Sequence, residues 1–354
     1  MTERVNANIV FHATNVHQGG GKALISALLS GIPRGVTVLA QFDRRIELTA
    51  GLLRRVMARY VSPSVIQRLM AEVWLSRNCD SQDTVLCFGN LPPLFPNCAR
   101  VVVFVQNRYL VDNAGLTGFS LQTRVRIWVE RFWLFGRASA VQEFVVQTPS
   151  MKGLLEKRIK GRVPVRVLPF VADPHGYDRK LRCDKPAKIG QLDFLYVASG
   201  EPHKNHLRLI SAWCLLAEEG LFPSLGVTID RKNFPDLCLW LDSRIEQSGL
   251  RVTNMGSIPQ EDIAGCYAAA GAFIYPSVFE SFGLPLVEAR QAGLPVIASE
   301  LDYVRDVIDP EQTFDPTSEV SISRAVKRHL GLAESSLALL DGAGFFKSVF
   351  GEAA

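Results

Sequence analysis

The sequence predicts an α/β protein with two doubly wound domains. Apolar runs typical of buried parallel strands, such as residues 100–106, alternate with helical patterns along the chain. The length of 354 residues suits two domains of ordinary size. Residues 173–188 are rich in proline, glycine and charge, which favours a linker there. We therefore expect an N-terminal domain at 1–170, a linker at 171–190, a C-terminal domain at 191–335, and at 336–354 a helix able to pack back on the first domain.

The composition indicates a packed protein of the reducing cytoplasm. Hydrophobic residues make up 47% of the chain and charged residues 21%. The seven cysteines include no Cys-x-x-Cys pair, so free thiols are expected. Residues 1–16 lack a long apolar core after their charges, so we expect no signal peptide. No run of about 18 apolar residues predicts a membrane span.

Charge is distributed unevenly between the two halves of the chain. Residues 1–162 carry 21 Lys and Arg against 10 Asp and Glu, a net charge of +11, whereas the remainder has 18 against 25, a net charge of −7. A basic half beside an acidic half indicates that one domain faces an anionic partner. Nucleic acid, a membrane surface and an anionic lipid are all compatible with this pattern.

A glycine-rich stretch follows the first expected strand. Residues 8–13 read as the strand and residues 23–30 as the next helix, with Gly19, Gly20 and Gly21 between them. Glycines at such a turn let a ligand approach the backbone closely, although a purely structural turn is the plain alternative. The spacing fits neither a P-loop nor the dinucleotide fingerprint, because the required glycine and Ser/Thr positions are absent.

Two further parts of the first domain carry arginines on expected helices. Six arginines punctuate residues 44–68, which we read as a helical region with either a solvated or a functional face. Residues 121–137 predict a helix with Leu121, Val125, Trp128, Phe132 and Phe135 on its buried face. Arg126, Trp133 and Arg137 then fall on the outer face. That face favours contact with an anionic membrane, and Trp133 packing under a neighbouring loop is the alternative.

The most informative stretch is residues 275–299, which predicts a strand end, a loop, a helix and a second strand. Pro285 suits the first turn of that helix. Glu280 precedes the helix and Glu288 lies about one turn inside it, so both can face the cleft at the carboxyl end of the strand. The helix start also offers free N–H groups to a phosphate. Taken singly, Glu280 could merely cap the helix and Glu288 could merely be solvated.

A second loop with candidate ligand-binding residues follows the strand expected at residues 193–197. It carries His203, Lys204 and His206 before a helix at residues 207–220. The His-x-x-His spacing alone is a weak metal motif, and no carboxylate motif completes it. We therefore expect no metal site there.

The stretch from Glu280 to Glu288 closely resembles the Glu-x7-Glu signature of retaining, nucleotide-sugar-dependent glycosyltransferases of the GT-B fold, the family 4 type. The resemblance is specific over residues 193–310 and looser over the first domain. It implies two Rossmann-like domains facing across a cleft, with Glu280 and Lys204 as the catalytic residues. The donor-binding residues it implies are Gly19, Gly20, Gly21, His203, Lys204, Arg208, Glu280, Phe282, Gly283, Leu284 and Glu288.

Two departures from the family pattern affect the assignment of roles. Gln106 and Asn107 occupy the acceptor side, where many members carry a histidine, and neither amide is a base at neutral pH. Ala198-Ser199 replaces the usual Gly-Arg pair, leaving His203 or Arg208 to supply the second cation. In the mechanism proposed for the family, the acceptor proton passes to the leaving phosphate, which requires no histidine.

The resemblance implies transfer of a sugar from a nucleoside diphosphate sugar to a glycan or lipid-linked acceptor of a bacterial surface polysaccharide. It implies neither a metal nor another cofactor, and no nucleic acid partner. The expected place is the cytoplasm, with peripheral contact at the inner face of the membrane. Two alternatives remain: a sugar-nucleotide epimerase on the same fold, and a catalytically silent nucleotide-binding partner of a polysaccharide synthase.

Overall fold

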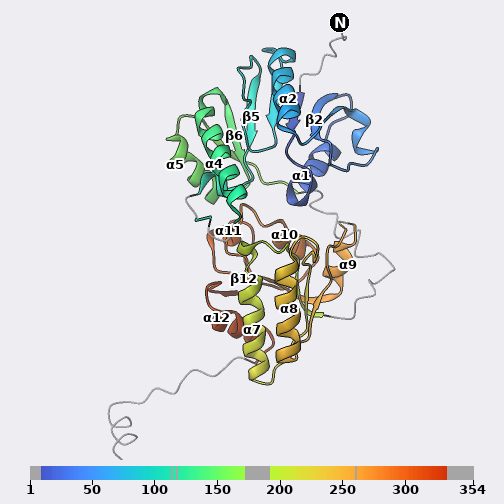
Figure 1. Cartoon of the computed structure of the whole chain (residues 1–354), viewed down its shortest axis with the longest axis vertical. Coiled ribbons are helices and arrows are strands. Elements are labelled where there is room, and N and C mark those ends of the chain that lie inside the picture. The colour runs from blue at the N-terminus through green and yellow to red at the C-terminus, as the bar shows by residue number, and fades with distance from the viewer. Residues whose placement is uncertain (1–8, 113–114, 117–118, 172–191, 260, 333–354) are drawn as a thin grey trace, which may run out of the picture.

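The computed structural model describes residues 9–112, 115–116, 119–171, 192–259 and 261–332, which form two α/β domains stacked along the long axis of the molecule (Figure 1). The first domain contains a seven-stranded parallel sheet of order β3-β2-β1-β4-β5-β6-β7. The second contains a six-stranded parallel sheet of order β10-β9-β8-β11-β12-β13. Both orders reverse direction beside the first strand of the domain, as in doubly wound sheets. The predicted fold class is confirmed.

The strands of the first sheet are short and mostly buried. Their sequences are rich in Val, Ile and Phe, which suit parallel strands covered on both faces. The strands are β1 Ile9–Ala13, β2 Val38–Asp43, β3 Val56–Val61, β4 Thr84–Cys87, β5 Arg100–Phe104, β6 Glu143–Val146 and β7 Val165–Val167. In the second sheet they are β8 Leu192–Tyr196, β9 Leu225–Val227, β10 Val252–Asn254, β11 Ala270–Tyr275, β12 Val296–Ser299 and β13 Gln312–Phe314.

Helices cover both sheets and enclose the apolar cores. Those of the first domain are α1 Gly19–Ser30, α2 Val65–Asn78, α3 Arg108–Val111, α4 Leu121–Gly136 and α5 Pro149–Ile159, with 3-10 turns at Leu52–Arg55 and Ala138–Ala140. Those of the second are α7 His206–Glu218, α8 Pro235–Ser248, α9 Ile263–Ala268, α10 Leu284–Gln291, α11 Asp302–Arg305 and α12 Glu319–His329, with a 3-10 turn at Pro202–Lys204. None of the helices in the described part of the chain is long and apolar enough to cross a membrane.

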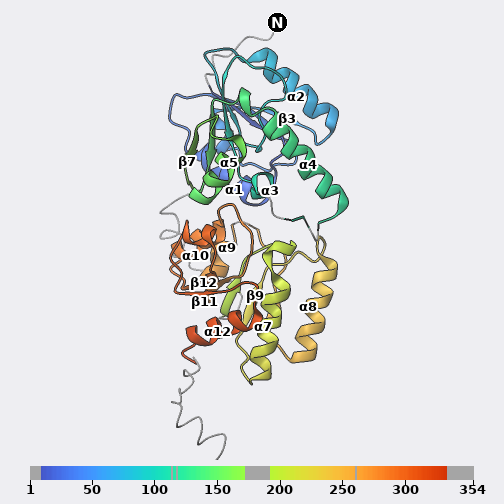
Figure 2. The same ribbon diagram turned by 90° about the vertical axis from the view of Figure 1, so that its left-hand side faces the viewer.

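The two domains meet at the carboxyl ends of their strands. Helices α1 and α10 lie at this junction in both views (Figures 1 and 2), and α11 lies there in Figure 1. The core of the first domain extends to the boundary, where Leu284 at the start of α10 packs against it. The loops that follow the strands therefore face one another across the junction, which is where open α/β sheets bind ligands.

Two expectations about the first domain are wrong. Residues 44–68 are not one helical region: Arg59 lies in strand β3, at the edge of the sheet, while Arg68 lies in α2. Strand β3 buries little of its surface, so its sequence lacks the apolar run that predicts a central strand. Helix α4 also faces the other way from the expectation. Its buried residues are Ile127 and Leu134, whereas Leu121, Val125, Trp128 and Phe132 are exposed.

The predicted linker, apart from residue 171, and the predicted helix at 336–354 lie outside the described residues. Strand β7 ends at Val167 before that stretch and β8 begins at Leu192 after it.

Candidate active site between the domains

The loop after strand β11 positions Glu280 at the junction of the domains. Strand β11 ends at the fully buried Tyr275, and Pro276 follows. The Oε1 atom of Glu280 accepts hydrogen bonds from Lys204 Nζ at 2.6 Å, Ser277 Oγ at 2.7 Å and Tyr275 OH at 3.0 Å. Both side chains of the Lys204–Glu280 ion pair are less than one-sixth exposed, at 15% and 13%. The carboxylate is thus held in one orientation by three donors from two loops.

The surroundings of Glu280 keep it ionised. Burial by itself would raise the pKa of this carboxyl group, but the Lys204 ammonium, the nearby His203 and the hydrogen bonds from Lys204 and Ser277 bring the pKa below its usual value. A carboxylate and an ammonium therefore stand side by side at the junction. Such a pair can bind hydroxyl groups through its oxygens and a phosphate through its nitrogen.

Lys204 reaches Glu280 because its loop is tied to the loop after β11. Asn205 adopts a left-handed conformation with φ 62°, and its Nδ2 donates to Pro276 O at 3.1 Å and to Pro316 O at 2.8 Å. The carbonyl of His203 accepts from Val278 N at 2.9 Å and from Ser277 Oγ at 3.1 Å. These contacts join residues 203–205 and 276–278 into one unit.

The two histidines of this loop have separate surroundings. His206 Nε2 bonds Ser199 O at 2.8 Å, and burial lowers its pKa to about 4, so it is neutral at physiological pH. Burial and the charge of Lys204 also lower the pKa of His203. Among the residues that the structure describes, no group of three His, Cys, Asp or Glu side chains is placed to hold a metal ion.

Glu288 lies on helix α10, where it accepts a hydrogen bond from Tyr267 OH at 3.1 Å through its Oε2. Tyr267 is fully buried on α9, so this contact fixes the carboxylate from the core side. Helix α10 begins after Gly283, whose φ of 79° favours glycine, and Pro285 occupies its first turn as predicted. Phe282 is buried just before that turn.

The three predicted glycines form the first turn of α1 instead of a loop before it, because the helix begins at Gly19. Their backbone N–H groups therefore belong to a helix start. A Cβ atom on Gly20 would lie 3.3 Å from Leu284 Cδ1 of the other domain, and one on Gly21 would lie 2.7 Å from Val16 Cγ1. Glycine thus lets the starts of α1 and α10 approach each other across the junction.

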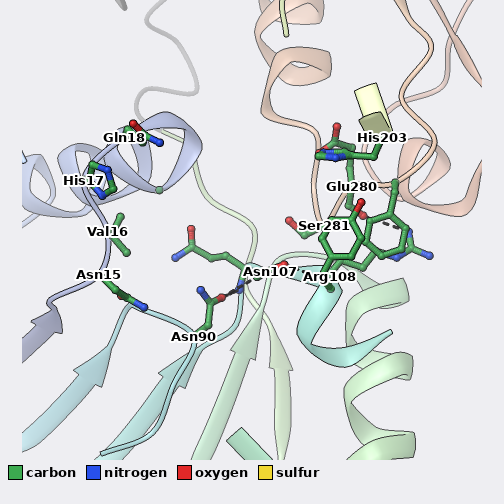
Figure 3. A pocket seen from close by; sticks show the side chains of 14 residues that line it. Asn15, Val16, His17, Gln18, Asn90, Asn107, Arg108, His203, Glu280 and Ser281 are labelled. Atoms are coloured by element: carbon green, nitrogen blue, oxygen red, sulfur yellow. Dashed lines mark hydrogen bonds between the residues drawn. The ribbon is translucent and has the colours of Figure 1, made fainter. Parts of the chain in front are cut away.

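A cavity of about 400 Å³ lies between the loop that leads into α1 and the loops that carry His203 and Glu280 (Figure 3). Asn15, His17 and Gln18 lie on one side of it, and His203, Glu280 and Ser281 lie on the other. Its lining includes the predicted residues Gly21, Gln106, Asn107, His203 and Glu280, together with Asn15, Val16, His17, Gln18, Asn90, Arg108, Tyr109, Phe279 and Ser281.

Gln106 and Asn107 also help to shape the first domain. Gln106 Nε2 donates to Phe88 O at 3.0 Å, and the side chain of Asn107 caps α3. Asn90 Oδ1 accepts the backbone N–H groups of Gln106 and Asn107 at 2.6 and 2.9 Å. These contacts fix the cavity wall that carries Gln106 and Asn107, and their predicted place on the acceptor side stays a prediction.

Arg108 and Tyr109, which the sequence did not single out, connect the domains. The Tyr109 ring lies 4.3 Å from the Phe279 ring, and the Arg108 guanidinium lies 4.6 Å from the same ring. Arg108 Nη1 donates to Glu280 O at 3.2 Å. Burial and the charges of Glu280 and Glu201 raise the pKa of Tyr109 to about 12. The signal available in the sequence was that Arg108 and Tyr109 follow the end of the strand expected at residues 100–106.

Arg208 lies at a distance from this constellation. Its Nη1 contacts Thr317 O and lies 3.2 Å from Glu319 Oε2, at the start of α12. The side chain is 40% exposed and the cavity lining does not include it. Its predicted role at the donor stays a prediction.

Solved structures with this arrangement define the class of fold. The chain superposes on WaaG, a glycosyltransferase involved in lipopolysaccharide biosynthesis, with a TM-score of 0.63 over 91% of this chain and 90% of that one, at 17% identity. It superposes on Anabaena HepE in complex with UDP and glucose with a TM-score of 0.62 over 91% and 89%, at 15% identity. The fold is therefore GT-B, two facing Rossmann-like domains.

The C-terminal half carries a specific family match. Residues 179–338 match the family model described as Glycosyl transferases group 1. The matched stretch is 160 of the 354 residues and includes the described strands and helices of the second domain.

Curated relatives match over a stretch of similar length. The O-antigen chain mannosyltransferase B of Escherichia coli is 33% identical over 140 residues, 38% of this chain and 36% of that protein. The serotype-specific mannosyltransferase WbdA of Escherichia coli is 30% identical over 145 residues, 40% of this chain and 18% of that protein. The matched part thus covers about a third or less of these relatives.

Proposed function

We propose that this protein is a retaining glycosyltransferase that moves a sugar from a nucleoside diphosphate sugar to a glycan or lipid-linked acceptor of a bacterial surface polysaccharide. The observation that carries the proposal is the Lys204–Glu280 ion pair, in which Glu280 lines the cavity between the domains. The group 1 family match and the O-antigen relatives support the reaction class.

The proposed reaction needs the charge of the leaving diphosphate to be held while the glycosidic bond breaks. The Lys204 ammonium has three N–H donors and uses one for Glu280, so the other two can donate to phosphate oxygens. The first turns of α1 and α10 add backbone N–H groups from both domains. Preorganised donors of this kind stabilise developing charge without reorganisation.

The two glutamates take separate parts of the donor in this proposal. Glu280, ionised and held by three donors, accepts hydrogen bonds from the hydroxyl groups of the sugar. Glu288, oriented by Tyr267, accepts from the ribose hydroxyl groups. The bond from the anomeric carbon to the phosphate oxygen breaks, and a bond to the acceptor oxygen forms on the same face. The acceptor proton passes to the departing phosphate oxygen.

We further propose a mannosyl donor, because five of the curated relatives are described as mannosyltransferases of O-antigen or serotype-specific synthesis. A thermal-shift panel of nucleoside diphosphates tests the donor site first, because a ligand that binds only the folded protein raises its apparent stability. Product analysis by NMR then reads the anomeric configuration. Transfer with inversion contradicts the retaining assignment. Conversion of the sugar nucleotide without any acceptor assigns an epimerase instead.

A further inference from the structure

Helix α4 exposes an apolar stripe that the core of the domain does not use. Leu121, Val125, Trp128 and Phe132 recur at intervals of four, three and four residues, so at 100° per residue they share one face. Their exposed fractions run from 54% for Val125 to 74% for Phe132. The Trp128 and Phe132 rings stack at 6.3 Å, and the stripe is about 16 Å long at the rise of a helix. Large exposed apolar patches indicate an interaction surface.

A groove lies beside the first part of this stripe, at Leu121, Val125 and Trp128. It has a volume of about 320 Å³ and is lined by Leu116, Leu121, Arg124, Val125, Trp128 and Arg131. Arg131 donates from its Nε to Tyr109 O and from its Nη2 to Asp112 O, each at 2.8 Å. Because Tyr109 lines the cavity between the domains, the groove is connected to the candidate active site through one side chain.

Helix α2 continues the surface beside α4. Both helices lie on the same side of the first domain (Figure 2). They also hold the same loop: Trp133 Nε1 of α4 donates to Pro92 O at 3.0 Å, while Glu72 of α2 accepts from Leu94 N at 2.9 Å. The first turns of α2 expose Val65, Ile66, Leu69 and Met70.

The charges of the two helices select the kind of partner. Together they carry five arginines, Arg68, Arg77, Arg124, Arg126 and Arg131, against two glutamates. Glu72 is buried against His12, and Glu130 lies 3.9 Å from Arg126. Arg124 and Arg126 are exposed beside the stripe. An apolar helix face with basic flanks complements an anionic bilayer, because its side chains enter the interface while its guanidinium groups meet lipid phosphates.

We propose that the exposed faces of α4 and α2, here called the α4–α2 face, dock on an anionic lipid bilayer. The proposal rests on the proposed function in one respect: a lipid-linked acceptor would be presented at the bilayer surface, beside the groove whose Arg131 donates to Tyr109 O. It replaces the sequence-based assignment to the Trp133 face, because Trp133 is bonded to Pro92 and only partly exposed.

Vesicle co-sedimentation of the full chain tests the surface. The wild type is expected to bind phosphatidylcholine vesicles that contain phosphatidylglycerol, to ignore pure phosphatidylcholine, and to leave the vesicles at high salt. A Trp128→Ser, Phe132→Ser variant is expected to bind at least about tenfold more weakly. The matched control replaces exposed leucines of the second domain, Leu207→Ser, Leu239→Ser, and is expected to bind like the wild type.

A second pair of variants tests the charges. Arg124→Gln, Arg126→Gln is expected to lower vesicle binding by roughly fivefold per arginine, and Arg251→Gln, Arg324→Gln of the second domain is expected to leave it unchanged. Failure of the wild type to bind anionic vesicles overturns the proposal, and so does full binding by the Trp128, Phe132 variant. If the wild type is a dimer that does not bind vesicles, and the Trp128, Phe132 variant is a monomer, the stripe is instead an interface with a second copy of the chain.

Nucleotide binding separates this proposal from the proposed function. A thermal-shift response to nucleoside diphosphates is expected to be the same in the wild type and the stripe variant, since neither residue lines the cavity. Nucleotide binding without vesicle binding contradicts only the proposed membrane docking. Vesicle binding without any nucleotide response contradicts the proposed donor site and supports the docking surface.

Discussion

At the scale of residues, the site depends on carboxylates whose partners fix their orientation. Glu280 has three hydrogen-bond donors on one oxygen, and Glu288 is approached from the core by Tyr267. Neither arrangement caps a helix, because helix α10 begins at Leu284, after the N-cap residue Gly283, without a side-chain cap. The plain alternative for Glu280, a capping role, is therefore wrong.

Glu288→Gln is expected to weaken binding of a nucleoside diphosphate about tenfold or more. A carboxylate bonded to hydroxyl groups makes charge-assisted contacts of roughly 1.5–3 kcal/mol, which an amide makes less well. Isothermal titration calorimetry measures the change. Glu246→Gln, an exposed glutamate on α8, is the matched control. Unaltered affinity in the Glu288 variant would refute its assignment to the ribose.

His206 is expected to make the fold sensitive to acid. Its pKa falls from 6.5 in the unfolded chain to about 4 in the fold, chiefly through burial. A depressed pKa gives stability that is present above pH 6.5 and lost as the pH falls towards 4. The loss from this one imidazole is up to roughly 3 kcal/mol. NMR titration of the imidazole and urea unfolding from pH 7 to 4 measure it. His206→Gln should flatten the decline, and an imidazole titrating near 6.5 would contradict the account.

At the scale of elements, α4 shows what a helical pattern can and cannot specify. The existence and bounds of the helix follow from the sequence to within one residue, from predicted 121–137 to observed Leu121–Gly136. Its orientation does not follow, because Trp133 and Arg137 bond the backbone of a loop, Pro92 and Pro93, that is distant in sequence. Apolar periodicity marks an apolar face without saying whether the protein's own core covers it.

Trp133→Phe is expected to lower the stability of the first domain by about 1 kcal/mol. The substitution keeps an aromatic ring but removes the Nε1 donor to Pro92 O, and a typical hydrogen bond contributes about that amount. The urea midpoint measures the effect. The matched substitution Trp128→Phe, on the exposed stripe, should change stability by only a few tenths of a kcal/mol. Equal effects at both positions would show that Trp133 is not a structural contact.

The candidate site could be predicted from the sequence where its residues follow strand ends of the second domain. The Glu280 to Glu288 stretch and Lys204 follow strand ends β11 and β8, and both loops meet in the structure. Arg108 and Tyr109 escaped prediction because their roles depend on contacts with Phe279 and Glu280, more than 170 residues away in the case of Arg108 and Glu280. Edge strand β3 was not predicted as a strand because it lacks a buried apolar run.

At the scale of the whole molecule, the two sheets present their strand ends to a shared cavity, and the positive groups around it come from both domains. In the proposed site, the first turns of α1 and α10 and the Lys204 side chain are the groups assigned to the diphosphate. A site built in this way can balance phosphate charge with protein groups.

Transfer activity is expected to continue in excess EDTA, because Lys204 and the two helix starts take the role that a divalent cation has elsewhere. The measurement is the rate of nucleoside diphosphate release with donor and acceptor present, with and without chelator. Loss of activity in EDTA that returns with magnesium or manganese would contradict this mechanism. A coupling-enzyme control in EDTA keeps the assay itself from giving a false loss.

Two hydrogen bonds across the junction end on neighbouring residues of one loop. Arg108 Nη1 donates to Glu280 O at 3.2 Å and Thr148 Oγ1 donates to Ser281 O at 3.2 Å, while Ser150 N donates to Asp306 Oδ2 at 3.0 Å after α11. A ligand that moves this loop would therefore also change the spacing of the two domains. We expect occupancy of the proposed sugar site to change the radius of gyration, which solution scattering measures without any label or chemical turnover.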